Sequence, residues 1–171
     1  PWMHVHGDQP WRAGALVHEL AERLFSGAMI GQGFPGDEDN GEMSMWWLWA
    51  GLGLYPLELA SGELRIGSPL FDDIRVRRAD GSTLRVLSHR QAPDARYLAS
   101  ATLDGTPLTR AVLPVDALVG DVVLELTFTA DAEEAAHGGV WGANEAAAPW
   151  HPDLTGVTGA YALPDFPANG D

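Results

Sequence analysis

The sequence predicts a mixed α and β protein in which two helices come first and an antiparallel, sandwich-like β layer follows. Two observations support this prediction. Apolar residues recur with helical spacing up to about residue 54, and the spacing changes to the alternation of β-strands after Tyr55 and Pro56. Short strands joined by tight turns are typical of antiparallel layers that pack as sandwiches.

Composition limits the classes of protein that the chain can belong to. Apolar residues make up 46% of its 171 residues, and seven are tryptophan, which excludes a disordered chain. The formal net charge of −14 argues against nucleic acid or an anionic membrane as partner. The absence of cysteine excludes disulfides, thiolate metal sites and a cysteine nucleophile. Because the chain begins at Pro1, we expect further sequence upstream of it.

The first predicted helix covers residues 8–25. Asp8 is placed to act as its N-cap, and Pro10 fits the first turn, where a missing N–H costs nothing. Glu19 and Arg23 have the i,i+4 spacing of a surface ion pair. Apolar residues recur on one face, namely Ala13, Leu16, Val17, Leu20 and Leu24.

The second predicted helix, residues 42–54, is apolar on every side. Its apolar residues are Met43, Met45, Trp46, Trp47, Leu48, Trp49, Leu52 and Leu54. Such a helix must be surrounded by other elements, and the single helix before it cannot do that. The sequence therefore predicts that residues 1–57 are the end of a larger helical assembly.

The β region is expected over residues 58–130. Five runs have the alternating pattern of strands: 64–66, 73–78, 83–89, 97–103 and 121–129. Asp80-Gly81 and Asp104-Gly105 are typical turn sequences. Residues 131–171 are rich in alanine, glycine and proline, and we expect an irregular tail there that includes Trp141, Trp150 and Tyr161.

The strongest candidate for chemistry is a glycine-rich acidic loop before the second helix. Asp37, Glu38 and Asp39 are consecutive, and the positive end of the following helix favours ionised carboxylates. An ionised carboxylate held at a pocket is what a general base requires. The alternative is simple N-capping by Asp39 or Asn40. An EF-hand calcium loop is excluded because Gly41 and Leu48 occupy ligand positions.

Four other features have weaker functional interpretations or none. His4 and His6 resemble a metal-ligand pair on an extended segment, but no third histidine lies near them in the sequence. Trp46 could stack on a sugar ring or belong to the core. Ser44 has no histidine at a motif spacing, so a serine nucleophile lacks support. His18 is an isolated histidine that is interpreted as surface or hydrogen-bonded structure.

Three stretches together resemble a known family. They are PWMHVHGDQPW at residues 1–11, the acidic loop and second helix at residues 33–55, and IGSPLF at residues 66–71, the last followed by SATLDG at residues 100–105. In combination they resemble the C-terminal part of glycoside hydrolase family 92, the calcium-dependent exo-acting α-mannosidases. The similarity runs from Pro1 to about Thr129.

The resemblance implies a fold and an activity. The fold would be an N-terminal β-sandwich packed on an (α/α)6 barrel, and this chain would hold the closing helices of the barrel and the C-terminal strands. The activity would be hydrolysis of terminal α-1,2-linked mannose with inversion, on mannose-containing glycans. Asp39 matches the general base, with Asp37 as the neighbouring candidate, and Glu38 and Trp46 are the candidate substrate contacts.

The resemblance also implies what this chain lacks. The general acid and most ligands of a Ca²⁺ cofactor would lie upstream of Pro1, in the N-terminal remainder of the enzyme, which would be secreted or periplasmic. Two departures matter, because His4-Val5-His6 replaces a Tyr-Asn-Tyr run and Asp37 stands where asparagine is common. Removal of mannose-1-phosphate-6-mannose caps is therefore one alternative, and a non-catalytic carbohydrate-binding β module is another.

Overall fold

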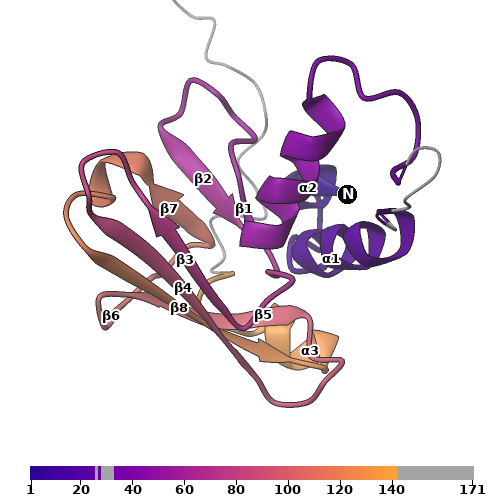
Figure 1. The fold of residues 1–171 in the computed structure, drawn as a ribbon. Helices are drawn as coiled ribbons and strands as arrows, with labels where there is room; N and C mark the ends of the chain where they lie inside the picture. Colours follow the sequence, from indigo (N-terminus) through magenta and orange to yellow (C-terminus); the bar gives the residue numbers. More distant parts are fainter. Residues whose placement is uncertain (26, 28–32, 142–171) are drawn as a thin grey trace, which may run out of the picture.

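The computed structural model describes residues 1–25, 27 and 33–141. Its N-terminal part is helical, with the 3-10 helix η1 (Trp2–His6), the helix α1 (Arg12–Leu24) and the helix α2 (Glu42–Leu52). Figure 1 shows these helices on one side of the molecule and the strands on the other. No helix among the described residues is long and apolar enough to span a membrane.

The strands form two sheets. The smaller sheet has the order β1-β2-β7, and its strands are β1 (Leu54–Tyr55), β2 (Glu63–Ile66) and β7 (Val112–Pro114). The larger sheet has the order β3-β4-β8-β5-β6, and its strands are β3 (Asp73–Arg77), β4 (Thr83–Arg90), β8 (Val122–Thr129), β5 (Tyr97–Leu103) and β6 (Thr106–Pro107). Two short helices complete the described chain, η2 (Val115–Ala117) and α3 (Ala132–Ala136).

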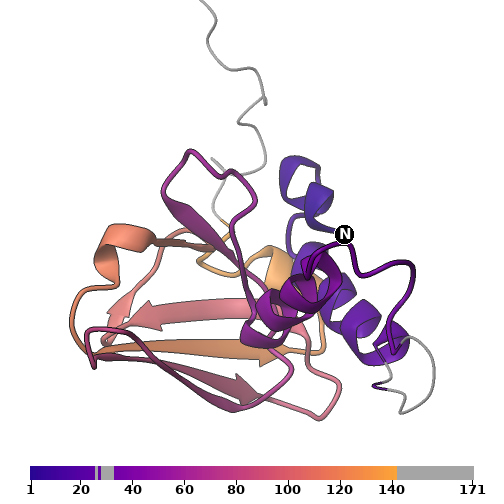
Figure 2. The same cartoon turned by 45° about the horizontal axis from the view of Figure 1, so that its top comes forward.

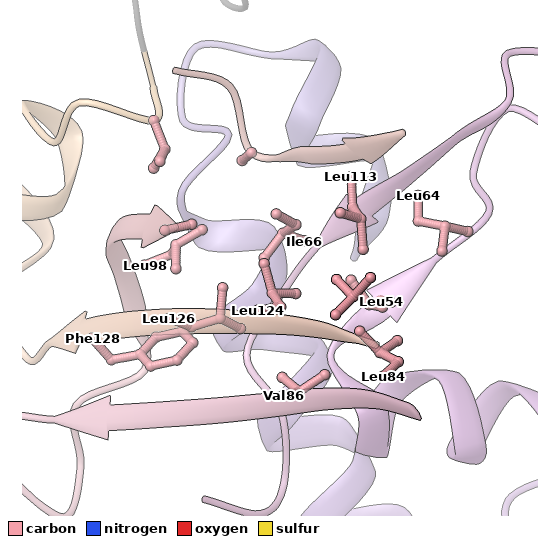
Figure 3. Close-up of a cluster of buried hydrophobic side chains, with 14 of the residues drawn as sticks. Leu54, Leu64, Ile66, Leu84, Val86, Leu98, Leu113, Leu124, Leu126 and Phe128 are labelled. Atoms are coloured by element: carbon pink, nitrogen blue, oxygen red, sulfur yellow. The ribbon is translucent and has the colours of Figure 1, made fainter. Parts of the chain in front are cut away.

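The two sheets face each other across one apolar core, which confirms the predicted sandwich. Leu124, Leu126 and Phe128 of β8 are completely buried, as is Leu113 of β7. Figure 3 shows the labelled side chains of the two sheets pointing toward one another. Alternation along β8 explains this arrangement, because successive side chains of a strand point to opposite faces and the apolar set therefore falls on one of them.

The prediction of an entirely antiparallel layer is wrong at one strand pair. β4 and β8 are parallel, with partners that run from Leu84 and Val122 to Arg90 and Phe128. The other pairs in both sheets are antiparallel. The physical reason is the route of the chain. After β6 it crosses to the smaller sheet as β7 and returns as β8 between β4 and β5, which reverses the direction that a simple meander would give.

The predicted turns are confirmed by the hairpins. Asp104 and Gly105 form the two-residue loop between β5 and β6, with φ of 49° and 77°. Positive φ at both central residues is characteristic of the type I′ turn, which matches the twist of the strands. Asp80 and Gly81 lie in the loop between β3 and β4, where the Asp80 carboxylate accepts a hydrogen bond from the Ser82 N–H at 2.9 Å.

The first helix begins later than predicted. α1 starts at Arg12 with Trp11 at its N-cap, and Asp8 does not cap it. Backbone turns take up the preceding residues, since Gly7 donates to the His4 carbonyl at 3.0 Å and Arg12 donates to the Gln9 carbonyl at 3.1 Å.

Short elements account for the remaining differences. The two-residue strands β1 and β6, the three-residue β7 and the helix α3 are too short to produce a periodic pattern. α3 places a helix at the start of the predicted irregular tail, with Asp131 as its cap. Trp150 and Tyr161 lie outside the described residues.

Candidate active-site loop

The acidic loop ends in an unusual backbone conformation directly before α2. Asp39, Asn40 and Gly41 have φ of 43°, 64° and 93°, so three successive residues occupy the left-handed region. Aspartate and asparagine are the side-chain-bearing residues that tolerate this region best. The local sequence therefore explains how the chain turns sharply enough for α2 to begin at Glu42.

Glu38 holds this turn against the helix. Its carbonyl accepts a hydrogen bond from the Glu42 N–H at 3.1 Å, and its carboxylate Oε1 accepts one from the Ser44 N–H at 3.2 Å. The N-cap residue is Gly41, which has no side chain to contribute. The interpretation that Asp39 or Asn40 caps the helix is therefore wrong, because the neighbouring Glu38 reaches the free N–H group instead.

Asp37 and Asp39 flank Glu38, and both are exposed. Within the described part of the chain, neither carboxylate has a hydrogen bond or an ion pair to another residue. The structure thus divides three consecutive acidic residues into one that stabilises the loop and two whose carboxylates face solvent. Exposed carboxylates without a protein partner are available to contact a water molecule or a substrate.

Trp46 lies one helical turn after the loop and is partly buried. Its ring stacks on Phe25 with 5.2 Å between centroids and 15° between planes. It also lines an apolar cavity of about 700 Å³ between α1 and α2, together with Leu20, Leu24, Met43 and Trp49. The stack shows a packing role for one face of the ring, while a contact between Trp46 and a sugar stays a prediction.

The residues proposed as metal ligands do not form a cluster. In the part of the chain that the structure describes, no group of three or more His, Cys, Asp or Glu side chains is placed to hold a metal ion. His4 and His6 lie in η1 rather than on an extended segment, so residues two apart point in different directions. His6 lies 3.7 Å from Glu58, which Arg65 already binds at 2.9 Å. The described residues therefore give no support to the interpretation of His4 and His6 as a metal-ligand pair.

One buried polar cluster was not predicted as functional. His18 of α1, Ser68 after β2 and Arg90 of β4 meet where the helices join the β layer. The signal in the sequence was a histidine on the apolar face of the first helix, beside Val17. That signal indicates a hydrogen-bonded core histidine, but it names no partner, because Ser68 lies fifty residues further along the chain.

The chain belongs to glycosyl hydrolase family 92, since the model of that family's catalytic domain matches residues 1–130. Solved structures of the family resemble it as well. The family GH92 α-mannosidase BT3965 from Bacteroides thetaiotaomicron has a TM-score of 0.69 and 22% sequence identity over 76% of this chain and 17% of that chain. The family GH92 inverting mannosidase BT2199 from Bacteroides thetaiotaomicron VPI-5482 has a TM-score of 0.67 and 27% identity over 82% of this chain and 19% of that chain.

A ligand-bound structure of the family is similar to this chain as well. A structure of BT3965 in complex with mannoimidazole has a TM-score of 0.69 and 21% identity, and it covers 78% of this chain and 18% of that chain. No curated protein sequence matches significantly. The chain thus spans less than a fifth of the length of these three solved structures. These findings confirm the family resemblance drawn from the three sequence stretches.

Proposed function

We propose that this chain supplies the general-base loop of an inverting α-mannosidase that removes terminal α-1,2-linked mannose from glycans. The observation that carries the proposal is the acidic loop, in which Asp37 and Asp39 are exposed on a backbone that Glu38 ties to α2. Membership of the family supports it, as does the similarity to BT2199, whose name describes an inverting mannosidase.

In an inverting mechanism the base and the acid stand on opposite sides of the glycosidic bond, roughly 6.5–9.5 Å apart to leave room for water. Asp39 would accept the proton of the water that attacks the anomeric carbon. Glu38 would orient the loop so that the carboxylate need not reorganise during the reaction. The acid would come from the part of the catalytic domain outside this chain.

We also propose that helices outside this chain surround α2 and complete an (α/α)6 barrel. Apolar side chains of α2 are exposed here, including Met45 at 48% and Leu48 at 54%. Exposed apolar surface on this scale is typical of a face that another element covers. With this assembly, residues 1–57 would form the end of the catalytic barrel, residues 58–130 the β region and residues 131–171 the C-terminal tail, which begins with α3.

We propose calcium as a cofactor of the complete enzyme, although the described residues of this chain do not form a calcium site by themselves. The described residues lack a cluster of three potential ligands, so the ion would have to be held mainly by residues of the remainder of the enzyme. We expect chelation with EGTA to lower the activity of the complete enzyme and added Ca²⁺ to restore it. Unchanged activity after exhaustive chelation would contradict the proposed cofactor.

We propose that the enzyme acts outside the cytoplasm, as the family resemblance implied.

The two alternatives are less well supported. An anionic mannose-1-phosphate-6-mannose cap would meet three consecutive acidic residues on a chain of net charge −14, so long-range repulsion favours a neutral mannoside. A carbohydrate-binding sheet would be expected to offer aromatic rings for stacking. The outward positions of β4 and β8 instead carry Arg85, Leu87, His89, Val123, Glu125 and Thr127.

The decisive test is Asp39→Asn in the complete enzyme, assayed on an α-1,2-mannobioside. We expect turnover to fall by about 10²–10⁴-fold, the contribution typical of a general base, with an unchanged melting temperature. Asp116→Asn is the matched control, because Asp116 is an exposed aspartate on η2 in the β region. If Asp39→Asn stays active, Asp37→Asn is tested next. Full activity in both variants would contradict a base in this loop.

A further inference from the structure

The IGSPLF stretch that helped to define the family has a structural position that the catalytic proposal does not use. Its residues 67–70, the junction segment, contact both helices, which lie beside the β layer (Figure 2). The segment is held to the C-terminal end of α2, because the Gly67 N–H donates to the Gly53 carbonyl at 2.7 Å and the Leu70 N–H donates to the Gly51 carbonyl at 3.0 Å.

The same segment lies against α1. A Cβ at Gly14 of α1 would stand 2.9 Å from the Gly67 Cα, closer than side-chain carbons approach, so the two backbones are in direct contact. His18 lies one turn further along α1 and is only 5% exposed. Its Nδ1 is 3.1 Å from the Ser68 carbonyl oxygen. A carbonyl oxygen only accepts, so this contact is a hydrogen bond in the tautomer that carries the proton on Nδ1, and the Ser68 hydroxyl lies 3.3 Å from the same nitrogen.

Arg90 of β4 connects the junction segment to the β layer. Its guanidinium donates to the Pro69 carbonyl at 2.6 Å and to the Ser68 hydroxyl at 3.3 Å, and it lies over the ring of Phe128 at 4.7 Å from the centroid. The fully buried Ser68 is thus shared, with His18 on one side and Arg90 on the other. This chain of contacts forms a polar connection between α1, α2 and the larger sheet.

The charges around His18 come from both regions. Glu22 of α1 lies 3.5 Å from His18 Nε2, and Arg96, just before β5, binds Glu22 at 2.5 Å. Arg90 lies on β4, and its Nε is 3.4 Å from Oδ1 of Asp72. Burial lowers the pKa of His18 below its ordinary value of 6.5, and Arg90 and Arg96 lower it further, while the Ser68 carbonyl and Glu22 partly oppose this shift. His18 is therefore neutral at pH 7.

We propose that His18 is a positioning residue, which sets α2 and the acidic loop against the β layer through the junction segment, and that acidification releases this connection. α2 has eleven residues and is therefore about 16 Å long. The junction segment holds the C-terminal end of α2. A shift there would tilt the whole helix and so move the acidic loop at its N-terminal end. The conformational part of this inference is independent of the proposed function, and only its effect on turnover depends on it.

The direction of the pH effect follows from the neutral state of His18 in the folded chain. Protonation would place a third positive charge beside those of Arg90 and Arg96 in a buried position, which is costly unless α1 withdraws from Ser68. The unfolded state takes up the proton near 6.5 and the folded state only at lower pH. The contribution of His18 is therefore complete above about pH 6.5 and is lost as the pH falls toward its lowered pKa.

Amide hydrogen exchange of the full chain between pH 8 and pH 5 tests this proposal, with rates corrected for intrinsic exchange. We expect the amides of Gly67, Leu70, Glu42 and Ser44 to lose protection below about pH 6.5, by up to about ten-fold per pH unit. His18→Gln, which cannot titrate but can still donate to the Ser68 carbonyl, should keep these amides protected. The exposed His89 provides the matched control, because His89→Gln should keep the wild-type response.

A second variant keeps the test decisive if His18→Gln is too unstable to measure. Glu22→Gln removes the anion that raises the pKa of His18, so the loss of protection should move to lower pH. An identical pH response in the wild type, His18→Gln and Glu22→Gln would overturn the proposal. Exchange does not depend on turnover, so full activity of both Asp39→Asn and Asp37→Asn would refute the catalytic proposal without affecting this one.

Discussion

The β layer and the helical part are both rich in apolar residues, but only the β layer encloses them within this chain. Leu124, Leu126 and Phe128 of β8 are completely buried between the two sheets. In α2, which is apolar on every side, the buried residues are Ala50 and Gly51. A sandwich closes because two sheets each have one apolar face, whereas a helix without a polar face needs neighbours all around. Apolar composition therefore predicts that a segment will be covered, but not by what.

Replacing one buried leucine and one exposed leucine by alanine tests the difference between the two regions most strongly. Leu124→Ala leaves a cavity in the closed core and should lower the free energy of unfolding by about 2–5 kcal/mol. Leu48→Ala removes a side chain that is 54% exposed and should change it by about 0.5 kcal/mol or less. Urea unfolding of the chain measures both values. Equal losses would show that α2 is covered in solution.

The contact between the two regions can be probed at the end of α2. Gly53 has φ of 72°, and a Cβ there would stand 2.4 Å from Pro69 Cγ, so Gly53→Ala must displace the junction segment. Gly62 is the matched control, because its φ is 69° and nothing lies within 4 Å of its Cβ position. We expect Gly62→Ala to cost about 1–2 kcal/mol for the left-handed backbone alone. Gly53→Ala should cost about 1–3 kcal/mol more, for overpacking.

Thermal and urea unfolding of the two glycine variants gives this difference directly. Equal destabilisation would mean that the contact between α2 and Pro69 adds nothing to the joining of the two regions. In that case the positions of the helices would be set by the polar connection through His18 and Arg90 rather than by close backbone packing.

Within the helical part, Glu38 should matter more to stability than its two neighbours. Glu38→Ala removes the acceptor for the Ser44 N–H and should lower the free energy of unfolding by about 0.5–2 kcal/mol, as the loss of a helix cap does. Asp37→Ala, at an exposed carboxylate, should change it by about 0.5 kcal/mol or less. Circular dichroism melts compare the two. A larger loss for Asp37→Ala would contradict the capping role of Glu38.

The smallest effect is expected at the surface of α1. Arg23 binds Glu19 at 2.6 Å, and their side chains are 73% and 43% exposed. Arg23→Gln should lower the free energy of unfolding by about 0.3–0.5 kcal/mol at low salt. The difference should vanish near 1 M salt, because the Debye length then falls to about 3 Å. A loss that persists in high salt would indicate that Arg23 contributes by packing instead.

Local patterns in the sequence determined most of the elements. The five predicted strands match β2, β3, β4, β5 and β8 to within one residue at each end. The Glu19–Arg23 pair and the Asp104-Gly105 turn formed as predicted. These features depend on residues no more than a few positions apart, so side-chain periodicity and backbone preference suffice to predict them. The motifs likewise predicted the family that the catalytic-domain match confirms.

Only the tertiary structure decided which distant residues meet. The parallel pairing of β4 with β8 depends on a crossing between two sheets, and the selection of Glu38 over Asp39 as the cap depends on three successive left-handed residues. His18 and Ser68 are fifty residues apart, and Ser68 and Arg90 are twenty-two apart. No local propensity encodes such contacts. They exist because the packing of both regions on the junction segment buries polar groups, which must then find partners in one another.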